Sequence, residues 1–156
     1  MSEPRLQRYL HEQGIGFETI HHARTQTAHD TALSARVDDR DFAKTVIVRL
    51  DSGIAMVVLA ADRRLDLAAL GLATGSETAE LVQESEFAAL FPDCEAGAMP
   101  PFGNLYGLDV YVDDVLSDDE EIAFNAGTHT ELIRMPYRDF ERVVHPKSID
   151  SRADAR

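Results

Sequence analysis

Two apolar runs near the middle of the chain give the clearest structural signal in the sequence. Residues 44–50 and 54–60 are almost continuously apolar, and only Asp51, Ser52 and Gly53 lie in the turn that separates them. Two such runs joined by a short turn that ends in glycine are typical of a β-hairpin. Because neither run alternates with polar residues, we expect the hairpin to be central and covered on both faces.

The rest of the chain alternates between helical and strand patterns. Apolar spacing and helix-end signals predict helices at 4–14, 27–36, 64–75, 85–92 and 136–144. Shorter alternating segments predict strands at 17–21, 79–83, 108–114, 121–127 and 130–135, of which the last two form a second hairpin. Two hairpins among interspersed helices predict an α+β fold with a mixed, largely antiparallel sheet flanked by helices.

The length of the chain, 156 residues, suits one domain with its own core. We place this domain at residues 1–147 and expect the polar segment 148–156 to form a flexible tail. The N-terminal segment is charged and lacks the apolar core of a signal peptide. No stretch approaches the roughly 18 consecutive apolar residues of a membrane span. We therefore expect a cytoplasmic protein that does not associate with membranes.

Charge and cysteine content argue against several classes of protein. The net charge of −13 argues against non-specific binding to nucleic acid, DNA included, because such binding needs a basic surface. The lone Cys94 has no partner for a disulfide, and the sequence contains no CxxC pair that would indicate structural zinc. His21, His22 and His29 are close in sequence, but adjacent histidines on a strand point to opposite faces. We therefore predict no metal site.

No standard catalytic motif is present, whether GxSxG, P-loop or GxGxxG. One feature that remains is Lys44, at the head of the first apolar run, in a chain that has only two lysines against thirteen arginines. Its ammonium either extends into water at the end of a strand or binds a carbonyl or phosphate inside a pocket. A compact point charge suits the second role better than a guanidinium does.

Two glycine-containing loops are the other candidates. The segment "GAMPPFG", residues 97–103, has two prolines that stiffen it and glycines that permit close approach by a ligand. It is either a tight crossing loop or a pocket wall on which the Gly97 N–H faces a developing oxyanion. The second loop, residues 126–129, turns at Gly127. Its His129 is either an exposed turn residue or a polar group at the rim of a pocket.

Taken in order, five segments resemble the YbaK / prolyl-tRNA-synthetase-associated domain family: "AKTVIV", "GAMPPFGNLYG", "VYVDDVL", "FNAGTHTELIRM" and "DFERVVHP". The resemblance extends over residues 3–146. It implies a mixed sheet, partly closed like a barrel and flanked by helices, and the activity of a trans-editing aminoacyl-tRNA deacylase. Such an enzyme hydrolyses the ester between a wrongly chosen amino acid and the 3′ end of a tRNA. No metal or organic cofactor is implied.

The same resemblance assigns roles to residues. It implies that Lys44, Gly97 and His129 are the catalytic positions, where a positioned water attacks an ester that is already activated. The Gly97 N–H would polarise the carbonyl, and Lys44 would hold the terminal phosphate or the carbonyl region. The expected substrate-binding residues are Phe42, Thr45, Met99, Pro100, Pro101, Phe102, Gly103, Ala126, Gly127 and Thr128. This mainly apolar wall favours a small amino acid, namely Ala, Ser, Thr or Cys.

The expected partner is the 3′ end of a mischarged tRNA. The amino acid, the source of the tRNA affinity and the function itself each keep alternatives. Family members often carry asparagine after the lysine, so Thr45 argues against an alanine editor specific for proline tRNA. With a net charge of −13, tRNA affinity would come from a synthetase partner or from a local patch formed by Arg63, Arg64, Arg134 and Arg138. Rival functions are a catalytically idle module that binds a tRNA end, a synthetase or a small molecule, and a hydrolase of other activated acyl esters.

Overall fold

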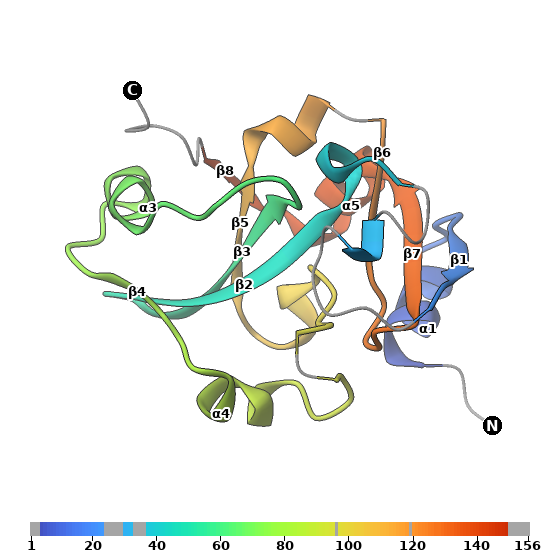
Figure 1. The fold of residues 1–156 in the computed structure, drawn as a ribbon, viewed down its shortest axis with the longest axis horizontal. Helices are drawn as coiled ribbons and strands as arrows, with labels where there is room; N and C mark the ends of the chain where they lie inside the picture. The colour runs from blue at the N-terminus through green and yellow to red at the C-terminus, as the bar shows by residue number, and fades with distance from the viewer. Residues whose placement is uncertain (1–3, 24–29, 33–36, 96, 119, 150–156) are drawn as a thin grey trace.

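The computed structural model describes residues 4–23, 30–32, 37–95, 97–118 and 120–149. Figure 1 shows two sheets side by side, with α5 between them and the other helices at the periphery. The larger sheet has five strands in the order β4-β2-β3-β5-β8, and the smaller has three in the order β1-β7-β6. Of the six strand pairs within these sheets, four are antiparallel and two are parallel. The predicted mixed, largely antiparallel α+β fold is confirmed.

The predicted central hairpin is confirmed and forms the middle of the larger sheet. β2 (Ala43–Leu50) pairs with β3 (Gly53–Ala60) along its whole length. Gly53 has φ +121°, a left-handed conformation that side chains rarely adopt, so the turn depends on glycine there. Apolar side chains cover both faces of this hairpin, with Ile47 in one buried cluster and Val48 in another. The continuous apolar runs therefore reflect burial on two sides.

Three more strands complete the larger sheet, and the sequence predicted two of them, β4 and β5. β4 (Ala79–Leu81) pairs antiparallel with β2, and β5 (Asp109–Asp113) runs parallel to β3. The expectation of a loose tail from residue 148 is wrong for its first residues, because β8 (Lys147–Ile149) pairs in parallel with β5. Ile149 is buried against the sheet and fixes this end of the chain. Residues 150–156 lie outside the described residues.

The smaller sheet is antiparallel throughout. β7 (Glu131–Pro136) lies between β1 (Glu18–His21) and β6 (Glu121–Asn125), and the predicted second hairpin is formed by β6 and β7. A single parallel bridge between Phe42 and Ala123 joins this sheet to the head of β2. The predicted closure into a partial barrel is not confirmed.

The helices whose two ends both lie in the described part of the chain are α1 (Arg5–Glu12), α3 (Leu67–Thr74), α4 (Glu84–Phe87) and α5 (Tyr137–Val144). Short 3₁₀ turns occur at Asp39–Asp41, Ala88–Leu90, Gly103–Leu105 and Asp114–Asp118. Of the helix predicted at 27–36, only residues 30–32 are described, and they are helical; the rest lies outside the described residues. No described helix is long and apolar enough to cross a membrane.

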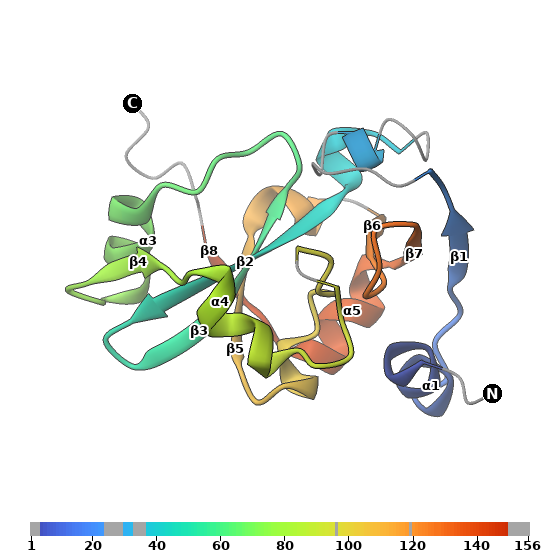
Figure 2. The same cartoon turned by 60° about the horizontal axis from the view of Figure 1, so that its bottom comes forward.

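The main core lies where both sheets, α1, α5 and the loop after α4 come together. Phe102, from that loop, is fully buried, and its ring packs on Phe124 of β6 at 5.5 Å and on Phe140 of α5 at 5.6 Å between centroids. Figure 2 shows this loop and α4 on the same side of the larger sheet. The aromatic contacts tie the loop to two other elements, so its backbone is held by the core.

The turn of the central hairpin is fixed by the carboxylate of Asp51. It accepts hydrogen bonds from the backbone N–H of Glu77 at 2.7 Å and from the backbone and hydroxyl of Thr78 at 3.1 and 2.7 Å. These bonds, with the Thr78 hydroxyl contributing most, lower the pKa of Asp51 from 3.8 to about 2. A folded-state pKa below the unfolded value stabilises the fold above pH 3.8, and the contribution is lost as the pH falls towards 2.

We expect the Asp51→Ala variant to be less stable than the wild-type protein at pH 7, and the difference to shrink between pH 4 and pH 2. The measurement is the urea midpoint of both proteins across that range, with Asp62→Ala as the control for an exposed acid. A difference that stays constant down to pH 2 would contradict the role of the Asp51 carboxylate.

Candidate active site

The loop at 97–103 is anchored by the residues that follow its first glycine. Met99 and Phe102 lie in the main core, and Pro100 and Pro101 are buried as well. Fully buried Phe102 is therefore placed to hold the loop. Phe42 is also fully buried, at the head of β2, but it packs in a separate cluster with Ala123 and Leu132. Met99, Phe102 and Phe42 are therefore core residues, whereas Pro100 also lines a hollow beside Ala126 and Gly127.

Gly103 has a packing role that the sequence did not reveal. A Cβ at this position would lie 2.6 Å from Cγ2 of Val110 and 2.9 Å from the carbonyl oxygen of Leu108. Such distances leave no room for any side chain. At Gly103, therefore, the missing side chain lets the loop pack against the start of β5, whereas the sequence suggested close approach by a ligand.

Gly97 is exposed and has φ +81°. It lies inside a tight turn in which the Ala98 N–H donates to the Glu95 carbonyl at 3.0 Å. The Gly97 N–H itself donates to no acceptor within the described part of the chain. An exposed backbone donor on a turn anchored by the core is the kind of group that can stabilise a developing oxyanion.

The second loop is bonded directly to this turn. The Gly127 N–H donates to the Ala98 carbonyl at 3.0 Å, and the Gly127 carbonyl accepts from the Glu95 N–H at 2.7 Å. Gly127 has φ +98°, so glycine suits the turn. We call the described residues 95, 97 and 98, together with residues 127–129, the loop clamp. It brings two segments that the sequence singled out separately into one backbone-bonded unit.

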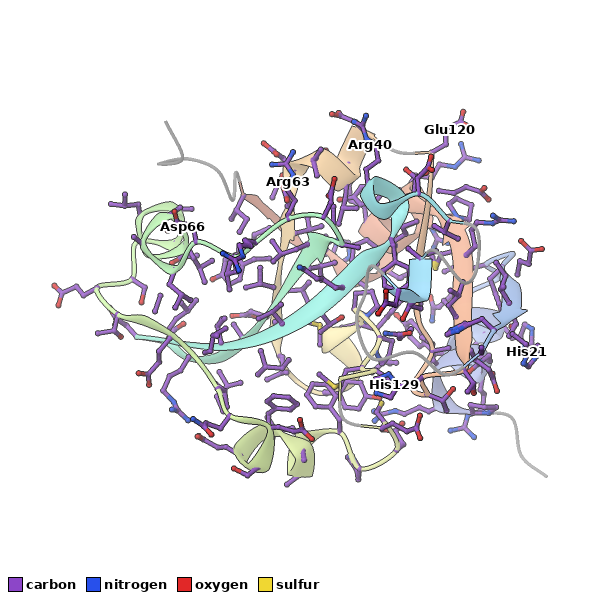
Figure 3. The ribbon with its side chains drawn as sticks, viewed as in Figure 1. His21, Arg40, Arg63, Asp66, Glu120 and His129 are labelled. Atoms are coloured by element: carbon purple, nitrogen blue, oxygen red, sulfur yellow. The ribbon has the colours of Figure 1, made fainter. Side chains whose placement is uncertain are left out.

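His129 lies against Gly97 across the loop clamp. A Cβ added to Gly97 would be 3.4 Å from Cε1 and 3.7 Å from Nε2 of the His129 ring. Figure 3 labels His129 at the end of the β6–β7 hairpin. The His129 backbone N–H donates to Oε1 of Glu95 at 2.7 Å. The structure therefore places His129 beside Gly97, and Ala126 and Thr128 belong to the same turn. The catalytic roles expected of Gly97 and His129 stay predictions.

Lys44 lies at the head of β2. Its Nζ donates to the Ala61 carbonyl at 3.4 Å. Beyond the parallel bridge between Phe42 and Ala123, the next residues on the same side of the two strands are Lys44 and Asn125. Asn125 leads directly into the 126–129 turn, and its buried Oδ1 has no hydrogen-bond partner among the described residues.

Thr45 points the other way. Alternation along β2 places it on the face of Ala43 and Ile47, which belong to the main core, and opposite to Lys44. Its buried Oγ1 has no hydrogen-bond partner in the described structure. Lys44 and Thr45 therefore do not share a face of the sheet.

A family model, the aminoacyl-tRNA editing domain, matches residues 22–143. The chain belongs to the aminoacyl-tRNA editing domain family. The predicted resemblance is confirmed, and so is the predicted activity of an enzyme that deacylates mischarged aminoacyl-tRNA.

Individual proteins resemble this editing domain over its whole length. The multifunctional Ser/Thr-tRNA deacylase ProXp-y of Escherichia coli (strain K12) is 26% identical over an alignment of 160 residues, which covers 99% of this chain and 95% of that protein. A crystal structure described as a candidate trans-editing enzyme for prolyl-tRNA synthetase has a TM-score of 0.82 and 21% identity, and covers 96% of this chain and 98% of its own. A scaffold protein used for computational epitope grafting has a TM-score of 0.82 and 22% identity, over 96% and 97%. These structures show the shared fold.

Cys94 of the editing domain does not suit nucleophilic catalysis. It is half-buried, its Sγ lies 3.4 Å from the Tyr106 hydroxyl, and burial raises the pKa of its thiol to about 11. A thiol with that pKa is almost wholly protonated at neutral pH. Cys94 lines a hollow of about 150 Å³ behind the 126–129 turn, together with Arg5, Tyr106 and Pro100. Cys94 therefore packs next to the 126–129 turn and has no catalytic role that the structure supports.

Acidic hollows on another part of the editing domain are unsuitable for a polyanionic tRNA. One of about 480 Å³ is lined by Asp38, Asp41, Glu121 and Arg134, among others. Arg134 forms ion pairs with Glu18 and Glu121, so its charge is balanced there. Within the described residues, no group of three or more His, Cys, Asp or Glu is arranged to hold a metal ion; His29 lies outside them.

We expect Gly103→Ala to destabilise the editing domain by about 1–3 kcal/mol, because its methyl group overpacks the contact with Val110. The matched control is Gly16→Ala, where a Cβ meets nothing within 4 Å. The measurement is the free energy of unfolding by urea for both variants. Equal stabilities would show that the 97–103 loop is not pressed against β5.

Proposed function

We propose that this editing domain is a trans-editing hydrolase that removes serine or threonine from mischarged tRNA. The observation that carries the proposal is the exposed Gly97 N–H, held by the loop clamp opposite His129. The choice of amino acid is supported by the E. coli relative that is named a Ser/Thr-tRNA deacylase. We assign the activity to the cytoplasm, where tRNAs are charged.

The proposed chemistry needs positioning more than a dedicated nucleophile. The aminoacyl ester is already activated, so a water held near the carbonyl carbon can attack it directly. Negative charge then develops on the carbonyl oxygen, and the Gly97 N–H donates a hydrogen bond to it. A preformed backbone donor of this kind is worth about a hundredfold to a thousandfold in rate.

Lys44, Asn125 and His129 would surround the rest of the ester. The Lys44 ammonium binds the terminal phosphate or the carbonyl region, for which a compact point charge is suited. The unpartnered Oδ1 of Asn125, on the same side of the strands as Lys44, can accept a hydrogen bond from a substrate hydroxyl or ammonium. His129 contacts the substrate at the rim, and Ala126, Gly127 and Thr128 limit the size of the side chain.

A second hydrolytic site is useful because a synthetase pocket rejects a smaller or isosteric amino acid by only about 100-fold. Threonine and serine each carry a hydroxyl that an apolar pocket tolerates, so they are typical errors. The net charge of −13 disfavours tight binding of tRNA by this chain alone. We infer that a synthetase partner supplies part of the tRNA affinity.

The test is a deacylation panel in which the purified full chain meets tRNAs charged with Ala, Ser, Thr or Cys. We expect release of serine and threonine above the spontaneous rate. In the same panel, we expect Lys44→Ala to lower the rate by about 100-fold while its melting temperature stays within about 2 °C. The control is Lys147→Ala, which removes the only other lysine of the chain, in β8.

Three results would change this account. Undiminished activity of Lys44→Ala would contradict the assigned role of that lysine. Binding of charged tRNA without turnover would favour the catalytically idle module. Hydrolysis of small activated esters, with no turnover of any charged tRNA, would favour a general acyl-ester hydrolase.

A further inference from the structure

Glu95 makes three hydrogen bonds within the loop clamp. Its backbone N–H donates to the Gly127 carbonyl at 2.7 Å, and its own carbonyl accepts from the Ala98 N–H at 3.0 Å. Its side-chain Oε1 accepts from the backbone N–H of His129 at 2.7 Å. Glu95 therefore closes the turn around Gly97 and joins that turn to Gly127. Its side chain also binds His129, the residue that lies against Gly97.

The side-chain bond differs from the other bonds of the clamp. The bonds of Glu95 and Ala98 to Gly127 run between backbone groups, so they are available to any residue at position 95. The bond from Oε1 to His129 depends on a side chain with an acceptor at the right reach. It is also charge-assisted, which makes it stronger than a neutral hydrogen bond. Substitution at Glu95 can thus remove the His129 link and leave the rest of the clamp in place.

The His129 ring bounds the space beside Gly97. Its Cε1 lies 3.4 Å from the place where a Cβ of Gly97 would stand, so the ring forms a wall next to the Gly97 Cα. If the backbone of His129 moves away from Glu95, the ring moves with it and the space widens. A displacement of about 1 Å in an active site can reduce the rate by about 100-fold.

We propose that Glu95 is a positioning residue for the editing reaction: its carboxylate holds His129 against the Gly97 turn and so keeps the reacting ester aligned. This inference rests on the proposed function of the site. It assigns to Glu95 no contact with the substrate. The residue acts through the backbone of His129, so the property that matters is an acceptor oxygen at Oε1.

The experiment compares Glu95→Ala, Glu95→Gln and the wild-type protein in deacylation of seryl-tRNA and threonyl-tRNA. Glutamine keeps an acceptor oxygen at the position of Oε1, whereas alanine removes it. We expect Glu95→Ala to lower kcat by about 10- to 100-fold with little change in KM. We expect Glu95→Gln to restore most of kcat. The control is Glu12→Ala, which removes one exposed negative charge at the end of α1.

Melting temperatures and the NMR signals of the His129 ring and backbone amide separate positioning from general stability. We expect Glu95→Ala to melt within a few degrees of the wild-type protein and to shift the His129 signals, and we expect Glu95→Gln to shift them less. Equal activity of Glu95→Ala and the wild-type protein would overturn the inference. So would a folded Glu95→Gln variant that is as slow as Glu95→Ala. An inactive wild-type protein would instead contradict the proposed function.

Discussion

The arrangement of the site depends on a reciprocal pair of backbone hydrogen bonds. Gly127 donates to the carbonyl of Ala98 and accepts from the N–H of Glu95. This pairing works like a short piece of sheet between two loops that are about thirty residues apart. Because backbone groups make the bonds, the geometry depends on backbone conformation, and positive φ at Gly97 and Gly127 suits both turns to glycine. The result is an exposed amide with a histidine ring beside it.

The core explains why this pairing is held in one place. The first loop continues into Phe102, whose ring contacts β6 and α5. The second loop is the connection between β6 and β7, and β6 meets the head of β2 at the bridge between Phe42 and Ala123. Lys44 and Asn125 extend from that bridge on one side. A rigid support of this kind suits a reaction in which most of the catalysis is positioning.

The sequence predicts elements whose signal is local. The central hairpin is visible because its strands are apolar on both faces, and the 126–129 turn is visible because of its glycine. β8 is not visible, because it crosses the point where the sequence turns into a polar segment at Ser148. These residues form a strand only because they pair with the edge of β5. Gly103 resembles a ligand-facing glycine until Val110 is known to lie against it.

The same limit applies to the site. Gly97 and His129 could be paired from the family resemblance, but the role of Glu95 depends on a contact with a residue 34 positions away. Asn125 likewise becomes a candidate only when β6 is placed beside β2. A glutamate in an acidic chain and an asparagine before a turn carry no signal by themselves. Such polar residues can be recognised as parts of the site only when the structure shows which of their donors and acceptors have hydrogen-bond partners.

The most direct test of the account is NMR of the ¹⁵N-labelled protein with a non-hydrolysable 3′-seryl-amido-adenosine. The account predicts that the Gly97 amide shifts on binding, in the direction of a stronger hydrogen bond, together with the signals of His129. Binding that leaves the Gly97 amide unchanged and shifts residues around Asp38 and Glu121 instead would contradict it.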